Sequence, residues 1–101
     1  MAAAIKTEVD NIIASHGVVV FSKTHCPYCK TAKSHLEKHG AKAHIVELDL
    51  VENGAAIQAY LLELTGQRTV PNIFIGQTHI GGCDKLLSLS DKDLNEKLAK
   101  L

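Results

Sequence analysis

The chain has 101 residues, of which 46% are apolar and 22% are charged, a composition typical of a small globular protein. Its 11 Lys and Arg residues balance its 11 Asp and Glu residues, and no run of like charge indicates a nucleic-acid or acidic-membrane surface. We therefore expect one domain over residues 1–101, with no nucleic-acid partner and no membrane partner.

Neither a targeting segment nor a membrane span is predicted. Residues 1–6 lack the basic start and the long apolar core of a signal peptide, and no later stretch is long enough to cross a bilayer. Three cysteines, two of them separated by only two residues, are typical of a compartment in which thiols are mostly reduced. The expected location is therefore cytoplasmic.

The first half of the chain predicts a helix, a strand and a second helix. Apolar residues at helical spacing predict a helix over residues 3–15. The β-branched run over residues 18–21 predicts a buried strand, and residues 22–25 form the loop that follows it. Residues 29–39 then have the pattern of a second helix.

A further strand, a helix and a hairpin follow. Alternating apolar and charged residues over 46–50 predict a half-buried strand, parallel to the first strand with a right-handed crossover. A third helix opens at Asn53-Gly54 and ends at Gly66. Two strands over residues 72–75 and 78–80, separated by Gly76-Gln77, predict a hairpin.

Two short helices complete the chain. One follows Asp84 and extends to Leu89, and the other begins at Ser90, which forms a capping-box pattern with Asp93. The order of elements predicts an α/β fold with a central four-stranded sheet and helices on both faces.

The residues with the clearest chemical signature are Cys26-Pro27-Tyr28-Cys29, placed where the first strand leads into the second helix. Cys26 would stand at the helix N-terminus, where unpaired backbone N–H groups favour a thiolate over a thiol. Pro27 suits the first helical turn because its missing N–H costs little there. Lys23 can add a positive charge beside the sulfur. We predict a redox-active cysteine pair.

Two alternatives apply to the same pair. A zinc site needs two more ligands, but Cys83 stands alone and the six histidines have no ligand-like spacing with it. A permanent structural disulfide would close a loop too short to restrict the unfolded chain much. We therefore expect no bound metal.

Three stretches in order resemble the dithiol glutaredoxins, members of the thioredoxin-fold superfamily. They are Lys23-Thr24-His25-Cys26-Pro27-Tyr28-Cys29, then Gln67-Arg68-Thr69-Val70-Pro71, then Gly81-Gly82-Cys83-Asp84. The resemblance covers essentially the whole chain, and it implies a thioredoxin-like fold with a four-stranded mixed sheet flanked by helices.

The resemblance also implies a glutathione site around Val70-Pro71. In the family this bond is cis, which turns the Val70 backbone toward an extended peptide such as glutathione. Sequence alone would favour a trans proline at the start of a strand. Gly81-Gly82 would allow close backbone approach, and Asp84 would pair with the γ-glutamyl ammonium or, alternatively, cap its helix.

Other positions have roles that the resemblance implies. Lys23, Gln58 and Arg68 are the candidates for the glycine carboxylate, although a surface arginine is more often only solvated. Tyr28 would lie beside the sulfurs, and Cys83 would be either a site residue or a small buried hydrophobe. The implied glutathione-binding residues are together Lys23, Tyr28, Gln58, Arg68, Thr69, Val70, Pro71, Gly82, Cys83 and Asp84.

The implied function is glutathione-dependent thiol–disulfide oxidoreduction, with Cys26 as the nucleophile and Cys29 as the resolving cysteine. Glutathione is then the co-substrate, glutathionylated proteins are partners, glutathione reductase acts indirectly through the glutathione pool, and the chain is a monomer. Thioredoxin is disfavoured because the chain has no tryptophan. A [2Fe–2S] carrier formed by two chains through Cys26 and glutathione is the other alternative, against which Pro27 counts.

Overall fold

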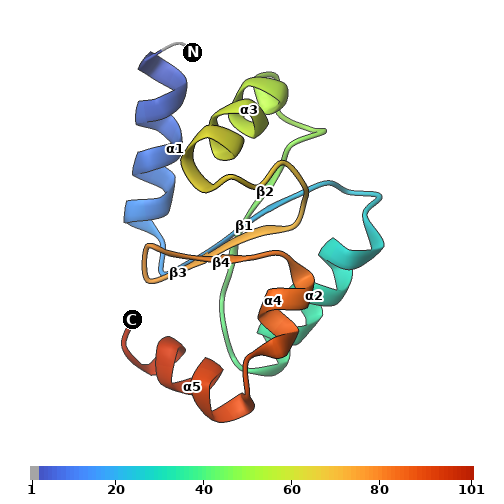
Figure 1. The fold of residues 1–101 in the computed structure, drawn as a ribbon, viewed down its shortest axis with the longest axis vertical. Helices are drawn as coiled ribbons and strands as arrows, with labels where there is room; N and C mark the ends of the chain where they lie inside the picture. Colours follow the sequence, from blue (N-terminus) through green and yellow to red (C-terminus); the bar gives the residue numbers. More distant parts are fainter. Residues whose placement is uncertain (1–2) are drawn as a thin grey trace.

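Five helices and four strands occupy residues 3–101, the part of the chain that the computed structural model describes (Figure 1). Met1 and Ala2, part of the stretch 1–6 in which no signal peptide is predicted, lie outside the described residues. The elements in order are α1 (Ala3–Ser15), β1 (Val18–Ser22), α2 (Pro27–Lys38), β2 (His44–Glu47), α3 (Gly54–Thr65), β3 (Asn72–Ile75), β4 (Thr78–Gly81), α4 (Cys83–Ser88) and α5 (Asp91–Ala99).

The strands form one mixed sheet in the order β2-β1-β3-β4. The β1 and β2 strands are parallel, with Phe21 opposite Val46, which confirms the predicted strand–helix–strand unit. The β3 strand runs antiparallel to both β1 and β4, and β3 and β4 form the predicted hairpin. All five residues of β1 are buried because the strand lies inside the sheet and is covered on both faces.

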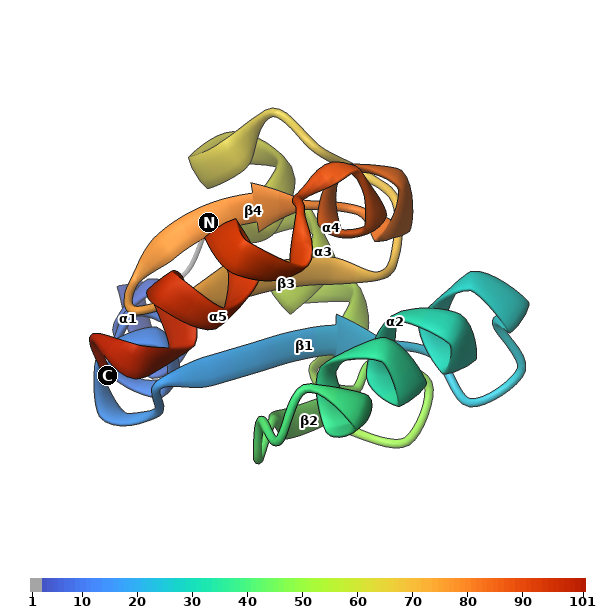
Figure 2. The same ribbon diagram turned by 90° about the horizontal axis from the view of Figure 1, so that it is seen from below.

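Helices cover both faces of the sheet (Figures 1 and 2), as predicted. Alternate residues of β1 serve the two sides, since successive strand residues point in opposite directions. Val19 and Phe21 belong to a core with α1 and α3, whereas Val18 and Val20 belong to a second core with α2, α4 and α5. The fold is therefore a three-layer α/β arrangement built around β1.

Helix ends follow local signals in the sequence. Gly66 ends α3 in the left-handed conformation at φ 77°, which a glycine adopts without the strain of a side chain. The Ser90 hydroxyl accepts the Asp93 N–H at 3.0 Å and caps α5, as predicted. None of the helices within residues 3–101 has the length and apolar character needed to cross a membrane.

The second strand differs from its prediction. The expected strand over residues 46–50 is in fact β2 at His44–Glu47, and Leu50 is 72% exposed. The Leu48 N–H still donates to Ser22 O at 2.8 Å, but the Leu50 N–H turns back to Glu47 O at 3.0 Å. The alternating pattern continues past the strand because Leu48 is buried in the turn that follows.

Candidate active site

Cys26 occupies the N-cap position of α2, with Pro27 in the first turn, as the sequence predicts. Its Sγ atom accepts the Cys29 N–H at 3.2 Å, and its own N–H donates to Lys23 O at 3.2 Å. The helix N-terminus therefore directs a backbone donor and the positive end of its dipole at the sulfur. The same Sγ lies 3.8 Å from Val70 O, across from the loop before β3.

Cys29 lies one turn further into α2 and is completely buried. Burial raises the pKa of the Cys29 thiol, and its hydrogen bond to Cys26 raises the pKa further. Ionisation of the Cys29 thiol is therefore disfavoured. Cys26, Cys29 and Cys83 are all free thiols in the structure.

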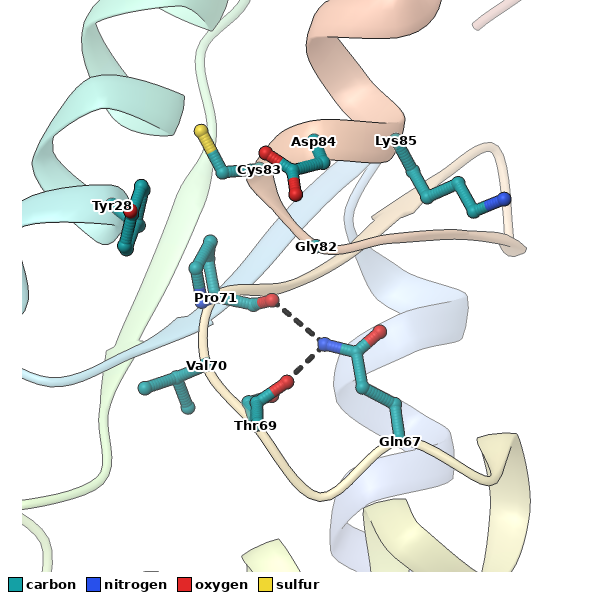
Figure 3. Close-up of a pocket in the computed structure, with 9 residues that line it drawn as sticks. All are labelled: Tyr28, Gln67, Thr69, Val70, Pro71, Gly82, Cys83, Asp84 and Lys85. Carbon is teal, nitrogen blue, oxygen red and sulfur yellow. Dashed lines mark hydrogen bonds between the residues drawn. The ribbon is translucent and has the colours of Figure 1, made fainter.

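A groove of about 550 Å³ opens beside α2, where the loop before β3 faces the start of α4 (Figure 3). Its volume lies within the range of about 300–1,000 Å³ that is usual for small-molecule pockets. Seven residues with predicted glutathione contacts line it: Tyr28, Thr69, Val70, Pro71, Gly82, Cys83 and Asp84. The fold thus brings together segments that lie more than 50 residues apart.

Gln67 also lines the groove, although sequence reasoning did not place it among the site residues. Its Nε2 donates to Thr69 O and to Pro71 O, both at 2.9 Å, and so joins the two ends of the turn that carries Val70 (Figure 3). The Val70-Pro71 bond is cis, as the resemblance implies. The sequence feature that could have identified Gln67 as a site residue is its place within the stretch 67–71, which resembles the glutaredoxins.

The start of α4 forms the opposite wall of the groove. Cys83 is buried, and burial, followed by the charges of Asp84 and Cys26, raises the pKa of its thiol. Asp84 lies exposed in the first turn of α4, whereas the N-cap is Gly82, so the alternative that Asp84 caps this helix is wrong. Lys85 is a second lining residue that the sequence analysis did not include.

Three of the predicted glutathione contacts do not line this groove. Gln58 and Arg68 line a separate depression of about 230 Å³ on α3, where Gln58 Nε2 donates to Arg68 O at 2.8 Å. Lys23 is half-buried in the loop before Cys26. Contact between these three side chains and glutathione stays a prediction.

The cysteine pair has no surrounding metal ligands in the described structure. Across residues 3–101, the side chains of histidine, cysteine, aspartate and glutamate form no group of three or more that could hold a metal ion.

The family model for glutaredoxin matches residues 18–80, which include the cysteine pair and all of the hairpin except Gly81. The chain belongs to the glutaredoxin family. It is 56% identical over 78 residues to a glutaredoxin of Ricinus communis, and the aligned stretch covers 77% of this chain and 76% of that protein. It is 58% identical over 78 residues to glutaredoxin-C2 of Arabidopsis thaliana, which covers 77% of this chain and 70% of that protein.

Solved glutaredoxin structures have the same fold. The buckwheat glutaredoxin–glutathione complex superimposes with a TM-score of 0.84 at 44% identity, over 96% of this chain and 86% of that one. Glutaredoxins as a family are glutathione-dependent thiol oxidoreductases of the thioredoxin fold. The oxidoreductase function that the resemblance implies is thus shown at the level of the family, and the roles of Cys26 and Cys29 in it stay predictions.

Proposed function

We propose that this glutaredoxin reduces protein–glutathione mixed disulfides through the thiolate of Cys26. The observation that carries the proposal is the position of Cys26 Sγ, which lies at the start of α2 and 3.8 Å from Val70 O in the wall of the groove. A thiolate in this position is stabilised by the Cys29 N–H and can face a peptide bound along Val70.

The reaction consists of two thiol–disulfide exchanges. Cys26 S⁻ attacks the glutathione sulfur of the substrate, the substrate S–S bond breaks, and the protein sulfur leaves as a thiolate that takes up a proton. A second glutathione thiolate then attacks the glutathione sulfur held on Cys26. This step releases oxidised glutathione and restores the Cys26 thiolate.

Cys29 offers a second route in which it attacks the Cys26 sulfur, expels glutathione and leaves a Cys26–Cys29 disulfide. Its burial and raised pKa leave little thiolate near neutral pH, so we expect the second glutathione to complete most turnovers on small glutathionylated substrates. The internal disulfide would serve substrates that are themselves protein disulfides.

Glutathione would lie along the groove with its peptide backbone against Val70. The exposed Asp84 carboxylate would pair with the γ-glutamyl ammonium, because the two groups carry opposite charges at neutral pH. Lys23, Gln58 and Arg68 would approach the glycine carboxylate from the other end. Their donors are suited to a carboxylate, although the Gln58 amide also bonds Arg68 O.

Three cysteines, two of them in a closely spaced pair, suit a compartment where thiols are mostly reduced. We propose that the protein is a cytoplasmic monomer. Its electrons would come from NADPH through glutathione reductase and the glutathione pool. Its protein partners are then glutathionylated proteins.

The proposal is tested by the reduction of a glutathionylated peptide with glutathione, NADPH and glutathione reductase. Cys26→Ser should lower kcat/KM by at least about a hundredfold, since the nucleophile is lost. Cys29→Ser should keep kcat/KM within about threefold of the wild type, because the second glutathione completes the cycle.

Lys38→Ala is the matched control, since it changes an exposed side chain at the other end of α2, outside the cysteine pair and the groove. An inactive wild type would contradict the proposed activity. Loss of activity in Cys29→Ser that equals the loss in Cys26→Ser would instead show that turnover requires the internal disulfide.

A further inference from the structure

A single carboxylate fixes the loop between β1 and Cys26. Both oxygens of Asp49 accept the Thr24 N–H, at 3.1 and 3.2 Å, and one of them also accepts a short hydrogen bond from the Thr24 hydroxyl. Asp49 lies in the turn after β2, 25 residues along the chain. This contact extends the pairing of β1 with β2 beyond the last bond of that edge, from Leu48 N–H to Ser22 O.

The Asp49 side chain is less exposed than that of the neighbouring His25. It is 23% exposed, whereas the neighbouring His25 side chain is 79% exposed and places its Nδ1 3.5 Å from Asp49. The hydrogen bond from the Thr24 hydroxyl holds the pKa of Asp49 below its ordinary value. Asp49 is therefore a carboxylate near neutral pH and accepts strong, charge-assisted hydrogen bonds.

Few other contacts hold this loop. Thr24 and His25 are exposed, and the Cys26 N–H bond to Lys23 O closes the turn between them at 3.2 Å. Thr24 lies inside that turn, so a shift in the position of Thr24 also shifts the position of Cys26.

We propose that Asp49 is the positioning residue for Cys26. By accepting hydrogen bonds from Thr24, Asp49 fixes the path of the chain into the N-terminus of α2. The Cys26 Sγ then keeps its hydrogen bond from the Cys29 N–H and its position across from Val70 O. The proposal rests on Cys26 being the nucleophile of the proposed function. A displacement of about 1 Å at the nucleophile is enough to lower a reaction rate by up to about a hundredfold.

The hydrogen bonds of Asp49 to Thr24 are expected to raise the reactivity of Cys26, whereas its negative charge is expected to lower it. A nearby carboxylate disfavours a thiolate, so removing only the charge should make Cys26 more reactive, whereas removing the hold on Thr24 should make it less reactive. Asp49→Asn removes the charge and keeps one carbonyl oxygen for the Thr24 N–H. Asp49→Ala removes both, so the two variants separate position from charge.

The test measures the rate of Cys26 alkylation by iodoacetamide near neutral pH, with mass spectrometry to identify the modified cysteine. Asp49→Ala should slow alkylation by about tenfold and lower kcat/KM on a glutathionylated peptide to a similar degree. Asp49→Asn should stay within about threefold of the wild type. Thr24→Val should also slow alkylation, and Thr24→Ser, which keeps the hydroxyl, should restore it.

Asp10→Ala is the matched control, because Asp10 is a hydrogen-bonded carboxylate on α1 that accepts from Lys6 and Tyr60. It should change stability without changing the alkylation of Cys26.

Three results would overturn the positioning role. They are unchanged alkylation in Asp49→Ala, equal acceleration in Asp49→Ala and Asp49→Asn, and slower alkylation in Thr24→Ser that matches Thr24→Val. Failure of the proposed function is distinguishable, since a wild type inactive on the glutathionylated peptide would still show slower Cys26 alkylation in Asp49→Ala.

Discussion

At the scale of single residues, the groove depends on side chains that bind the protein's own backbone. Gln67 uses one amide nitrogen to hold Thr69 O and Pro71 O, the carbonyls on either side of Val70. These bonds fix the turn before any ligand arrives. A preformed turn lowers the ordering cost of binding, because fewer backbone torsions are lost when the ligand docks.

Replacing Gln67 by Leu should therefore weaken binding more than chemistry. Two neutral hydrogen bonds contribute about 0.5–1.5 kcal/mol each, so kcat/KM should fall by roughly tenfold, mainly through a higher KM for the glutathionylated peptide. Steady-state kinetics over a range of peptide concentrations separate the two parameters. A lower kcat at unchanged KM would contradict this role.

Asn95→Ala is a suitable control for Gln67→Leu. It also removes an exposed side-chain hydrogen bond, between Asn95 Oδ1 and His39 Nδ1 at 3.0 Å, but from α5 rather than from the groove. It should leave both kinetic parameters unchanged.

Sequence patterns predicted the residues whose chemistry is local. Cys26 and Pro27 could be placed at a helix start because a strand, a loop and a helical pattern follow one another directly. Gln67 and Asp49 could not be assigned their contacts in this way. Their partners depend on how the loop before β3 folds and on where β1 and β2 end beside each other. Neither feature produces a periodic pattern in the sequence.

At the scale of elements, the turn between β2 and α3 determines where α3 can lie. Gly54, the first residue of α3, is buried, and a Cβ built on it would lie 1.8 Å from Leu48 O. The helix therefore approaches the turn closely enough to exclude every side chain but hydrogen at this position. Asn53-Gly54 is recognisable as a helix start from the sequence, but the need for glycine at this position comes from the close approach of Leu48 O.

Gly54→Ala should destabilise the protein because backbone, rather than a flexible side chain, must move to admit the methyl group. Overpacking of this kind costs about 1–3 kcal/mol in the free energy of unfolding, which urea denaturation can measure. Gly17→Ala is the control. Its added Cβ would meet the end of the Leu101 side chain at 3.0 Å, which can move, so the loss should be under about 0.5 kcal/mol.

A small loss in Gly54→Ala, equal to that in Gly17→Ala, would show that the turn after β2 can move freely. That result would also argue against the positioning role of Asp49, since Asp49 lies in the same turn.

At the scale of the whole molecule, the two cores on either side of β1 place the reactive end of the sheet. β1 ends at Ser22, and β3 begins antiparallel to it at Asn72, directly after Val70-Pro71. The start of α2 and the loop before β3 therefore meet at one edge. The order of elements predicted the layers and the parallel β1–β2 pair, but the lateral position of the hairpin beside β1 depends on packing that no local pattern specifies.

The same packing makes stability depend on pH through His44. The rings of His16, directly after α1, and His44, in β2, stack with centroids 3.8 Å apart. Burial, and then the charge of His16, lowers the pKa of His44 below its ordinary value. The folded protein thus takes up a proton at this position less readily than the unfolded chain does.

The sign of the effect follows from proton linkage. Above the unfolded pKa of about 6.5, His44 is neutral in both states and its contribution to stability is complete. As the pH falls, the unfolded chain binds the proton first, so the free energy of unfolding decreases until the folded pKa is also passed. One such proton contributes at most about 1.4 kcal/mol per pH unit.

The free energy of unfolding of the wild type should therefore decrease between about pH 7 and about pH 5, and His44→Asn should make this slope shallower. Part of the slope should remain, because burial also lowers the pKa of His79. Urea denaturation at several pH values measures both slopes, and His25→Asn is the control at an exposed histidine. Identical slopes in the wild type and His44→Asn would assign the acid sensitivity to other groups, whereas a shallower slope would show that the junction of α1 and β2 contributes to it.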